Sequence, residues 1–362
     1  MSKRVCLISL NLSGGGAQRV LLNQAEMFVD GGYNVDIIIM KNKVDYDYDD
    51  VYNVHFLSNT RYISNNKLLN LFLFYERMVD LINSLEKSNG RFDLFLSHSY
   101  DSDQLIKFLK RENKFSVIHG TMSNYLKNWH FLKRHLYKLV YKNEQICAVS
   151  KGVKDDLLSA VGIKPKLINV INNPFNIDRI KHLSNEPTYF DNDYILFVGS
   201  INKIKRLDVL LKGYKRSNIL QQLVILGGDD NYSEYFQMVQ KITEDLGLQT
   251  KVKFINFVKN PYPFIKNAKL LVLSSDHEGL PTVLIEALIL DTMVVSTNCE
   301  SGPSEILTGV LSNYLAPVGD YKALGDKINK AVNNPIAITD KFYRRYDQRV
   351  IFNHYKNLIG EG

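Results

Sequence analysis

Two glutamates, Glu278 and Glu286, occupy positions that favour ligand binding over acid–base chemistry. Glu278 is expected in a loop between a short apolar run and a helix, and Glu286 lies more than one turn inside that helix. Because the helix is apolar nearly all round, a carboxylate there is costly unless it is paired or binds a ligand. This placement predicts that Glu286 accepts hydrogen bonds from a ligand diol, such as that of a ribose.

The start of the same helix is a candidate anion site. Pro281 suits the first helical position. The neighbouring residues Gly279, Leu280 and Thr282 would present backbone N–H groups to a negatively charged ligand. An ordinary helix start is the alternative, because acidic residues such as Glu278 favour a first turn.

Three consecutive glycines, Gly14, Gly15 and Gly16, follow the first apolar run and open the first expected helix. Glycine lets the backbone approach a ligand closely, and a helix N-terminus presents N–H groups to an anion. The spacing matches neither the dinucleotide fingerprint G-x-G-x-x-G nor a P-loop. The segment therefore predicts a phosphate-facing turn, with a plain strand-to-helix turn as the alternative.

A second loop after a strand-like run carries three cations. Lys203, Lys205 and Arg206 follow the run 194–198, where they could neutralise a diphosphate. Lysine offers a point charge and arginine a planar fork for such a group. A solvated basic loop is the alternative.

These candidates all follow short apolar runs that alternate with stretches of helical periodicity, such as 17–29 and 232–246. This alternation favours parallel sheets with right-handed crossovers. The expected strands are 5–10, 35–40, 94–97, 116–119 and 146–149 in the first half, and 194–198, 223–226, 252–255, 270–273 and 294–297 in the second.

The alternation restarts near Asp193, after a polar linker. The chain is therefore predicted to be α/β, with two Rossmann-like doubly wound parallel-sheet domains over 1–185 and 186–345. Residues 346–362 are expected to form a helix that can cross back onto the first domain. A ligand cleft is expected between the carboxyl ends of the two sheets.

The composition is that of a globular protein with two cores. The chain has 362 residues, 45% of them hydrophobic and 23% charged, which exceeds the usual size of one core. No run approaches the ~20 apolar residues of a membrane span. The first run is also too short for a signal peptide, so a cytoplasmic location is expected. Cys6, Cys147 and Cys299 lack metal-ligand spacing and are expected to be reduced core residues.

The excess positive charge belongs to the first half of the chain. The net charge is +7, and residues 1–180 hold 24 Lys/Arg against 18 Asp/Glu. Residues 125–142 hold five Lys/Arg, no acid and the single tryptophan. This segment predicts a basic amphipathic helix that lies on an anionic membrane surface. A surface helix packed on the sheet is the alternative.

These segments together resemble the retaining GT-B glycosyltransferases of sequence family four, which carry a Glu-x7-Glu motif in the second domain. The resemblance extends over most of the chain. It rests on Gly15-Gly16-Ala-Gln18-Arg-Val, Cys147-Ala-Val-Ser150-Lys151, Asn172-Asn173-Pro174, Leu226-Gly227-Gly228-Asp229, Glu278–Glu286 and Cys299-Glu-Ser-Gly302-Pro303-Ser-Glu305-Ile.

The resemblance implies roles for the second-domain residues. Glu278 would lie near the hydroxyls of the transferred sugar and Glu286 would hold the nucleotide ribose. Ser200 stands where the family often has an arginine that clamps the donor diphosphate. The clamp would then rest on Lys205, with Lys203 or Arg206 as substitutes, while Gly228 would belong to a substrate-binding turn.

In the first domain, His119 matches a family histidine that contacts the sugar, and His98 is a weaker candidate. A histidine that only caps its strand is the alternative for each. With Gly15 and Gly16 at the diphosphate, the implied reaction is a front-face substitution in which the leaving phosphate helps to deprotonate the acceptor. Catalysis would then consist mainly of positioning and charge stabilisation, without the carboxylate pair of retaining glycosidases.

The resemblance further implies a nucleotide-sugar co-substrate, with UDP expected by analogy, and no metal or other cofactor. The acceptor would be a glycan or lipid-linked hydroxyl in lipopolysaccharide, capsule or another surface polysaccharide, reached from the inner face of the membrane. The alternatives are a GT-B-like epimerase or hydrolase of sugar nucleotides and a nucleic-acid-binding protein. Only the pI near 9.0 suggests the latter, and its cations lack an aromatic stacking platform. The sequence does not identify the transferred sugar (a hexose or an N-acetylhexosamine) or the linkage that forms.

Overall fold

The computed structural model describes residues 2–13, 15–44, 48, 50–58, 66–188, 193–228 and 233–360. The chain divides into two compact units, Met1–Phe175 with Gln348–Gly362, and Asn176–Asp347. The first unit ends before residue 185, the boundary predicted from the linker. The reason is that helix α7 (Ile177–Leu183) packs against α10 (Tyr262–Asn267) and α11 (Thr282–Ile289) of the second unit.

The first unit is built on one parallel sheet. Among the described residues its strands are ordered β3-β2-β1-β4-β5-β6-β7, and every neighbouring pair is parallel. The strands are β1 (Arg4–Ser9), β2 (Asn34–Ile39), β3 (Asn53–Phe56), β4 (Leu94–Ser97), β5 (Lys114–Ile118), β6 (Gln145–Ala148) and β7 (Leu167–Val170).

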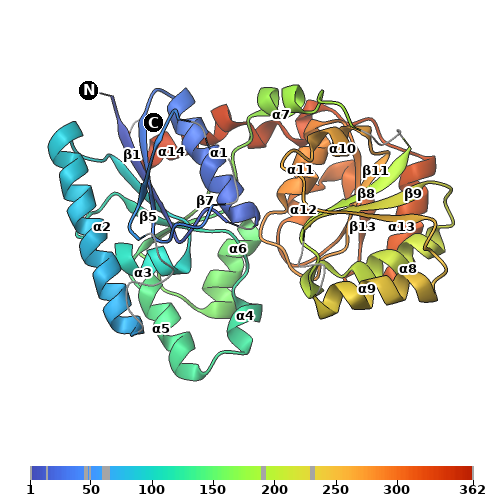
Figure 1. The fold of residues 1–362 in the computed structure, drawn as a ribbon, viewed down its shortest axis with the longest axis horizontal. Helices are drawn as coiled ribbons and strands as arrows, with labels where there is room; N and C mark the ends of the chain where they lie inside the picture. Colours follow the sequence, from blue (N-terminus) through green and yellow to red (C-terminus); the bar gives the residue numbers. More distant parts are fainter. Residues whose placement is uncertain are drawn as a thin grey trace. The chain divides into compact units, whose positions relative to one another are not determined.

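Helices connect these strands (Figure 1). They are α1 (Gly16–Asp30), α2 (Lys67–Asn89), α3 (Tyr100–Phe108), α4 (Ser123–Lys127), α5 (Phe131–Tyr141) and α6 (Lys151–Asp155), and the unit also contains the last helix of the chain, α14 (Gln348–Leu358). Apolar residues of α2 and α3 form one buried cluster with the inner residues of β1, β2 and β4.

The last helix, α14, belongs to the first unit and packs against α1 (Figure 1). The Tyr355 ring lies 5.5 Å from that of Phe28, and Gln24 Nε2 donates a hydrogen bond of 2.9 Å to the Tyr355 hydroxyl. The chain therefore returns to its first sheet after completing the second.

The second unit repeats the plan. Its described strands are ordered β10-β9-β8-β11-β12-β13, all parallel. The strands are β8 (Tyr194–Val198), β9 (Gln222–Leu226), β10 (Val252–Ile255), β11 (Leu270–Leu273), β12 (Met293–Thr297) and β13 (Leu315–Ala316). Its further helices are α8 (Leu207–Ser217), α9 (Glu234–Asp245), α12 (Pro303–Ile306) and α13 (Tyr321–Asn333). The prediction of two doubly wound parallel-sheet α/β domains is confirmed.

The prediction of one continuous helix over 125–142 is wrong. The chain forms α4 and α5 with an extended residue between them, since His130 has φ −56° and ψ 147°. The Arg134 guanidinium explains the break: its Nε donates a 3.0 Å hydrogen bond to the Trp129 carbonyl, and a terminal nitrogen donates to the Lys127 carbonyl. These carbonyls at the end of α4 are thus satisfied by a side chain, as helix ends require.

Candidate functional site

Most of the predicted residues follow the strands at which each sheet reverses its order. In the first unit β1 lies between β2 and β4, and in the second β8 lies between β9 and β11. Open parallel sheets bind ligands at the carboxyl ends of such strands. Gly15 and His98 follow β1 and β4, and Lys205 and Glu278 follow β8 and β11. The topology therefore supports a ligand-facing edge in each unit.

In the second unit, Lys205 and Glu278 form an ion pair. The Lys205 Nζ lies 2.6 Å from Glu278 Oε1, and the side chains are 22% and 12% exposed. The same carboxylate oxygen accepts a hydrogen bond of 2.6 Å from the Ser275 hydroxyl. A residue predicted to clamp a diphosphate thus contacts the residue predicted to lie near the sugar.

The position of Lys205 is fixed by its backbone. Asn202 Oδ1 accepts hydrogen bonds from the Ile204 and Lys205 amides at 3.0 and 3.3 Å. From the strand β11 side, the Ser274 hydroxyl donates to the Lys205 carbonyl at 2.6 Å, and the Asp276 amide donates to Ile204 O at 2.9 Å. The turn that carries Lys205 is therefore attached to the loop that carries Glu278.

Ser200 and Arg206 support this turn. Asn202 Nδ2 donates to the Ser200 hydroxyl at 2.9 Å. Arg206 Nε lies 2.9 Å from Asp208 Oδ1, and its Nη1 lies 3.0 Å from Asp276 Oδ1. Arg206 therefore joins the two loops through two carboxylates, and its predicted role as a substitute in the clamp stays a prediction.

Lys203 lies on the same turn and is exposed. Among the described residues no ion pair or hydrogen bond of its side chain is found, so it is the available cation beside Lys205. Its predicted role as a substitute in the clamp stays a prediction.

Helix α11 places Glu286 as predicted but begins one residue late. Pro281 has φ −68° and ψ 98° and precedes the first helical residue, Thr282. The prediction that Pro281 is the first helical residue is wrong because the proline ring fixes φ and leaves ψ free to be extended. Glu286 is 9% exposed between Ile285 and Ala287, which are fully buried.

The loop before α11 is supported by a segment that the sequence analysis did not assign to the site. The Ser301 hydroxyl donates a 2.7 Å hydrogen bond to the Gly279 carbonyl. Gly302 has φ +91°, and a Cβ on it would lie 2.4 Å from Pro281 Cδ. Only glycine fits this approach. Ser301 lies in the segment 299–306 that carries part of the family resemblance, whereas Ser274 and Ser275 have no sequence signal beyond their place just after a strand.

The glycine turn after β9 meets the turn after β8. A Cβ on Gly227 would lie 1.8 Å from the Gly199 carbonyl oxygen, and one on Gly228 would lie 2.8 Å from Phe257 Cβ. Glycine at both positions lets these strand ends pack against their neighbours. Asp229 lies outside the described residues.

The glycine turn of the first unit precedes α1. Gly15 is the N-cap residue, Gly16 is the first helical residue, and the first turn has neither an acidic residue nor a side-chain cap. Both glycines are exposed. This arrangement supports the predicted anion-facing turn, while Gly14 lies outside the described residues.

His98 and His119 are brought together at the ends of β4 and β5. His98 Nδ1 lies 3.1 Å from His119 Nε2. Burial lowers the pKa of His119 to about 4 and, with a contribution from His119, lowers that of His98 well below its usual range. Both histidines are therefore neutral at neutral pH. The sequence placed each one separately and did not predict their contact.

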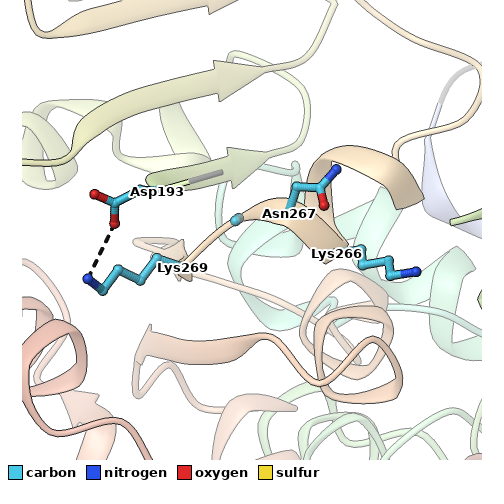
Figure 2. A pocket seen from close by; sticks show the side chains of 5 residues that line it. Asp193, Lys266, Asn267 and Lys269 are labelled. Atoms are coloured by element: carbon cyan, nitrogen blue, oxygen red, sulfur yellow. Dashed lines mark ion pairs between the residues drawn. The ribbon is translucent and has the colours of Figure 1, made fainter. Parts of the chain in front are cut away.

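A hollow of about 380 Å³ lies at the opposite edge of the second sheet. It is lined by Asp193, Lys266, Asn267, Ala268 and Lys269, and Figure 2 shows Asp193 facing Lys269, with 3.3 Å between their charged atoms. Asp193 and Lys269 precede β8 and β11, at the amino ends of the strands. This hollow is therefore separate from the candidate site.

Helix α5 has a buried aromatic face and an exposed apolar face. Tyr137 and Tyr141 pack on α3, where the Tyr141 hydroxyl donates a 2.7 Å hydrogen bond to the buried Asp103 carboxylate. On the other side, Leu132, Leu136 and Leu139 are 56%, 59% and 40% exposed. The helix is thus attached to the fold by one face while apolar residues at i, i+4 and i+7 face outward.

The described part of the chain offers neither a membrane-spanning helix nor a cluster of metal ligands. No helix there has both the length and the apolar character needed to cross a bilayer. No three His, Cys, Asp or Glu side chains among those residues gather as they would around a metal ion. The predicted independence of metal stays a prediction.

Two family models match adjacent parts of the chain. Residues 14–179 match the model described as glycosyltransferase family 4, and residues 178–350 match the one described as glycosyl transferases group 1. Together they span almost all of both units.

Individual relatives are distant. The chain is 25% identical to the N-acetylgalactosamine-N,N'-diacetylbacillosaminyl-diphospho-undecaprenol 4-alpha-N-acetylgalactosaminyltransferase of Campylobacter jejuni, covering 97% of this chain and 98% of that protein. It is 26% identical to the lipopolysaccharide 1,6-galactosyltransferase of Salmonella typhimurium over 63% of this chain and 64% of the other. Its fold is similar to that of Anabaena HepE in complex with UDP and glucose, with a TM-score of 0.78, 14% identity, and 99% and 100% of the two chains covered.

Proposed function

This chain belongs to glycosyltransferase family 4 and has the GT-B fold, and we propose that it transfers a sugar, with retention, from a UDP-sugar to a hydroxyl of a glycan or lipid-linked acceptor. The observation that carries the proposal is the Lys205–Glu278 pair at the strand-order reversal of the second unit. Neighbouring groups there suit a diphosphate and a sugar. The related transferases named above act on lipopolysaccharide or on an undecaprenol-linked glycan, which supports a role in surface glycan assembly.

The proposed division of labour follows the position of each residue. Lys205, held by Asn202 and Ser274, neutralises the charge that develops on the leaving diphosphate. Glu278 accepts hydrogen bonds from sugar hydroxyls, and Glu286 accepts them from the ribose diol. The leaving phosphate helps to deprotonate the acceptor hydroxyl, so the protein mainly positions the reactants.

A donor screen tests this function. The protein is incubated with UDP-, GDP- and ADP-sugars, and thermal shift and nucleotide release are measured with and without EDTA. We expect UDP-sugars to raise the melting temperature and, once a glycan or lipid-linked acceptor is added, to release UDP equally in both conditions. Stabilisation by no nucleotide sugar would refute the transferase, and loss of activity in EDTA would refute metal independence. Release of sugar to water or a change of sugar configuration, without any acceptor, would favour the hydrolase or epimerase.

We also propose that the protein works at the inner face of the membrane, with α5 lying on an anionic lipid surface. The exposed leucines of α5 offer apolar area, and Lys133 and Lys138 are exposed beside them. Amphipathic helices with this composition bind the interface. The Lys133 Nζ lies 4.1 Å from the centre of the Trp129 ring. In this proposal Trp129 lies at the membrane interface and Lys133 faces the lipid beside it.

Replacing Lys133 and Lys138 by Gln is expected to weaken binding to phosphatidylserine vesicles by about 30-fold, because each cation contributes about 1 kcal/mol near an anionic surface. Vesicle pelleting measures this change. The matched control replaces the exposed Lys241 and Lys322 of the second unit and should bind as the wild type does. Equal binding by both variants would contradict the membrane role of α5. Arg134 is left intact because it holds the α4–α5 break.

A further inference from the structure

The first two turns of α2 carry apolar side chains that face outward. Leu68, Leu69 and Phe72 are 79%, 48% and 57% exposed, and Leu68 and Phe72 lie one turn apart on the same side of the helix. The opposite side of α2 packs into the core of the first unit, where Phe74 and Met78 are buried. Neighbouring exposed apolar residues of this kind mark a surface that contacts a membrane or another protein.

These residues lie at the same height of the helical layer as the exposed face of α5. Helices α2, α3 and α5 each run back from the carboxyl end of a parallel strand, and α3 contacts both of the others. The Tyr75 ring of α2 lies 6.2 Å from that of Phe108 at the end of α3, and the Tyr100 ring at the start of α3 lies 5.2 Å from that of Tyr137 on α5. Because α2 begins about 12 Å before Tyr75 and α3 begins about 12 Å before Phe108, the first turns of α2 are level with Tyr137 and the exposed leucines beside it.

The two stretches of chain that carry these helices have cations and no acids at this level. Residues 51–75 contain Arg61 and Lys67, residues 113–143 contain six Lys/Arg, and neither stretch contains Asp or Glu. Helix α3 adds one acid that is not buried, Asp101. An apolar surface with surplus cations fits an anionic lipid bilayer. A second copy of the chain fits less well, because a two-fold contact would place the same cations against each other.

We propose that the first turns of α2 form a second membrane contact beside α5, so that the first unit meets an anionic bilayer through two helices of one layer. The inference rests on the proposed membrane role of α5. It adds an orientation, because two contacts fix how the unit lies on the bilayer, whereas one helix leaves it free to roll about the helix axis. The ends of α2 and α5 that touch lipid are those nearest the carboxyl edge of the sheet, which places the ligand-facing edge of this unit close to a lipid-linked acceptor.

A fluorescent label that responds to its surroundings, nitrobenzoxadiazole, tests this contact in the full chain. It is attached to the cysteine of a Phe72→Cys variant, since the three native cysteines are buried in the folded protein. With phosphatidylserine vesicles we expect the emission to rise and to shift to shorter wavelength. Leu220→Cys is the matched control, because Leu220 is 88% exposed in the second unit, and its label should not respond. An unchanged label at residue 72, or the same shift in both variants, would overturn the inference.

A second pair of variants measures the contribution of α2 to binding. Leu68→Gln combined with Phe72→Gln should weaken vesicle pelleting about 30-fold, because two apolar side chains no longer enter the interface. Val310→Gln combined with Val318→Gln changes two exposed apolar residues of the second unit and should bind vesicles as the wild type does. The UDP affinity should be unchanged in both double variants.

The remaining outcomes separate the possible partners. A label shift at residue 72 that needs no vesicles and disappears on dilution would assign the surface to a second copy and overturn the lipid contact. Equal pelleting with phosphatidylcholine and phosphatidylserine vesicles would overturn the anionic bilayer as the partner. Loss of pelleting on changing α5 but not α2 would overturn the second contact alone. A protein that binds vesicles through both helices and binds no nucleotide sugar would refute the proposed transferase and leave this inference standing.

Discussion

Replacing Lys205 by Met should lower kcat by about 10²–10³-fold, the usual effect of removing one preorganised group that stabilises developing charge. The leaving diphosphate would lose its cation, and Glu278 would lose the partner that lies 2.6 Å away. Steady-state turnover measures the first effect. UDP binding should fall about tenfold or more, while uridine binding should stay unchanged, because only the diphosphate contacts the lysine.

Lys203→Met is the matched control for this experiment. It removes the same charge from the same turn but at an exposed residue that has no ion pair in the described structure. We expect a change in turnover of less than about threefold, as for a surface charge. Equal losses of UDP and uridine affinity in Lys205→Met would contradict the diphosphate role. An equal loss of turnover in the two variants would show that the diphosphate charge is shared between both lysines and is not neutralised mainly by Lys205.

The fold was predictable because buried strands have simple sequence patterns. The runs 194–198 and 270–273 coincide with β8 and β11, since each is a short apolar segment bounded by polar or glycine residues. The two edge strands of the first sheet were missed for the opposite reason. The residues of β3 and β7 are mostly half-exposed or exposed, so their composition does not differ from that of a loop.

The break between α4 and α5 could not be predicted from the sequence because tertiary contacts cause it. The segment has neither proline nor glycine at 128–130, and its apolar residues keep a helical spacing. The chain turns there because the Arg134 side chain satisfies the end of α4 and because Trp129 packs edge-on against Tyr137, with ring centres 6.1 Å apart. Propensity alone gives no sign of either contact.

The candidate site was predictable residue by residue but not as a network. Strand ends identified Lys205 and Glu278 separately, although they are 73 positions apart. Their contact depends on β8 and β11 being neighbours, which is a property of sheet order. The Asp276 carboxylate reaches Arg206 through the same strand order, so no sequence pattern indicates that this arginine is paired across the two loops.

Replacing Glu286 by Gln should weaken both UDP and uridine binding by about 10²-fold or more. Each hydrogen bond to a charged group contributes about 1.5–3 kcal/mol, and the ribose diol is expected to make two of them. Glutamine preserves the volume at a position that is 9% exposed, so the melting temperature of the protein without ligand should not fall. Calorimetry with the two ligands measures the loss.

Glu244→Gln, which neutralises an exposed carboxylate on α9 of the same unit, is the control and should bind both ligands normally. The two site variants then separate the parts of the nucleotide. Lys205→Met should lose UDP and keep uridine, whereas Glu286→Gln should lose both by similar factors, because the ribose is common to them. A Glu286→Gln protein that still binds uridine would remove this carboxylate from the ribose site.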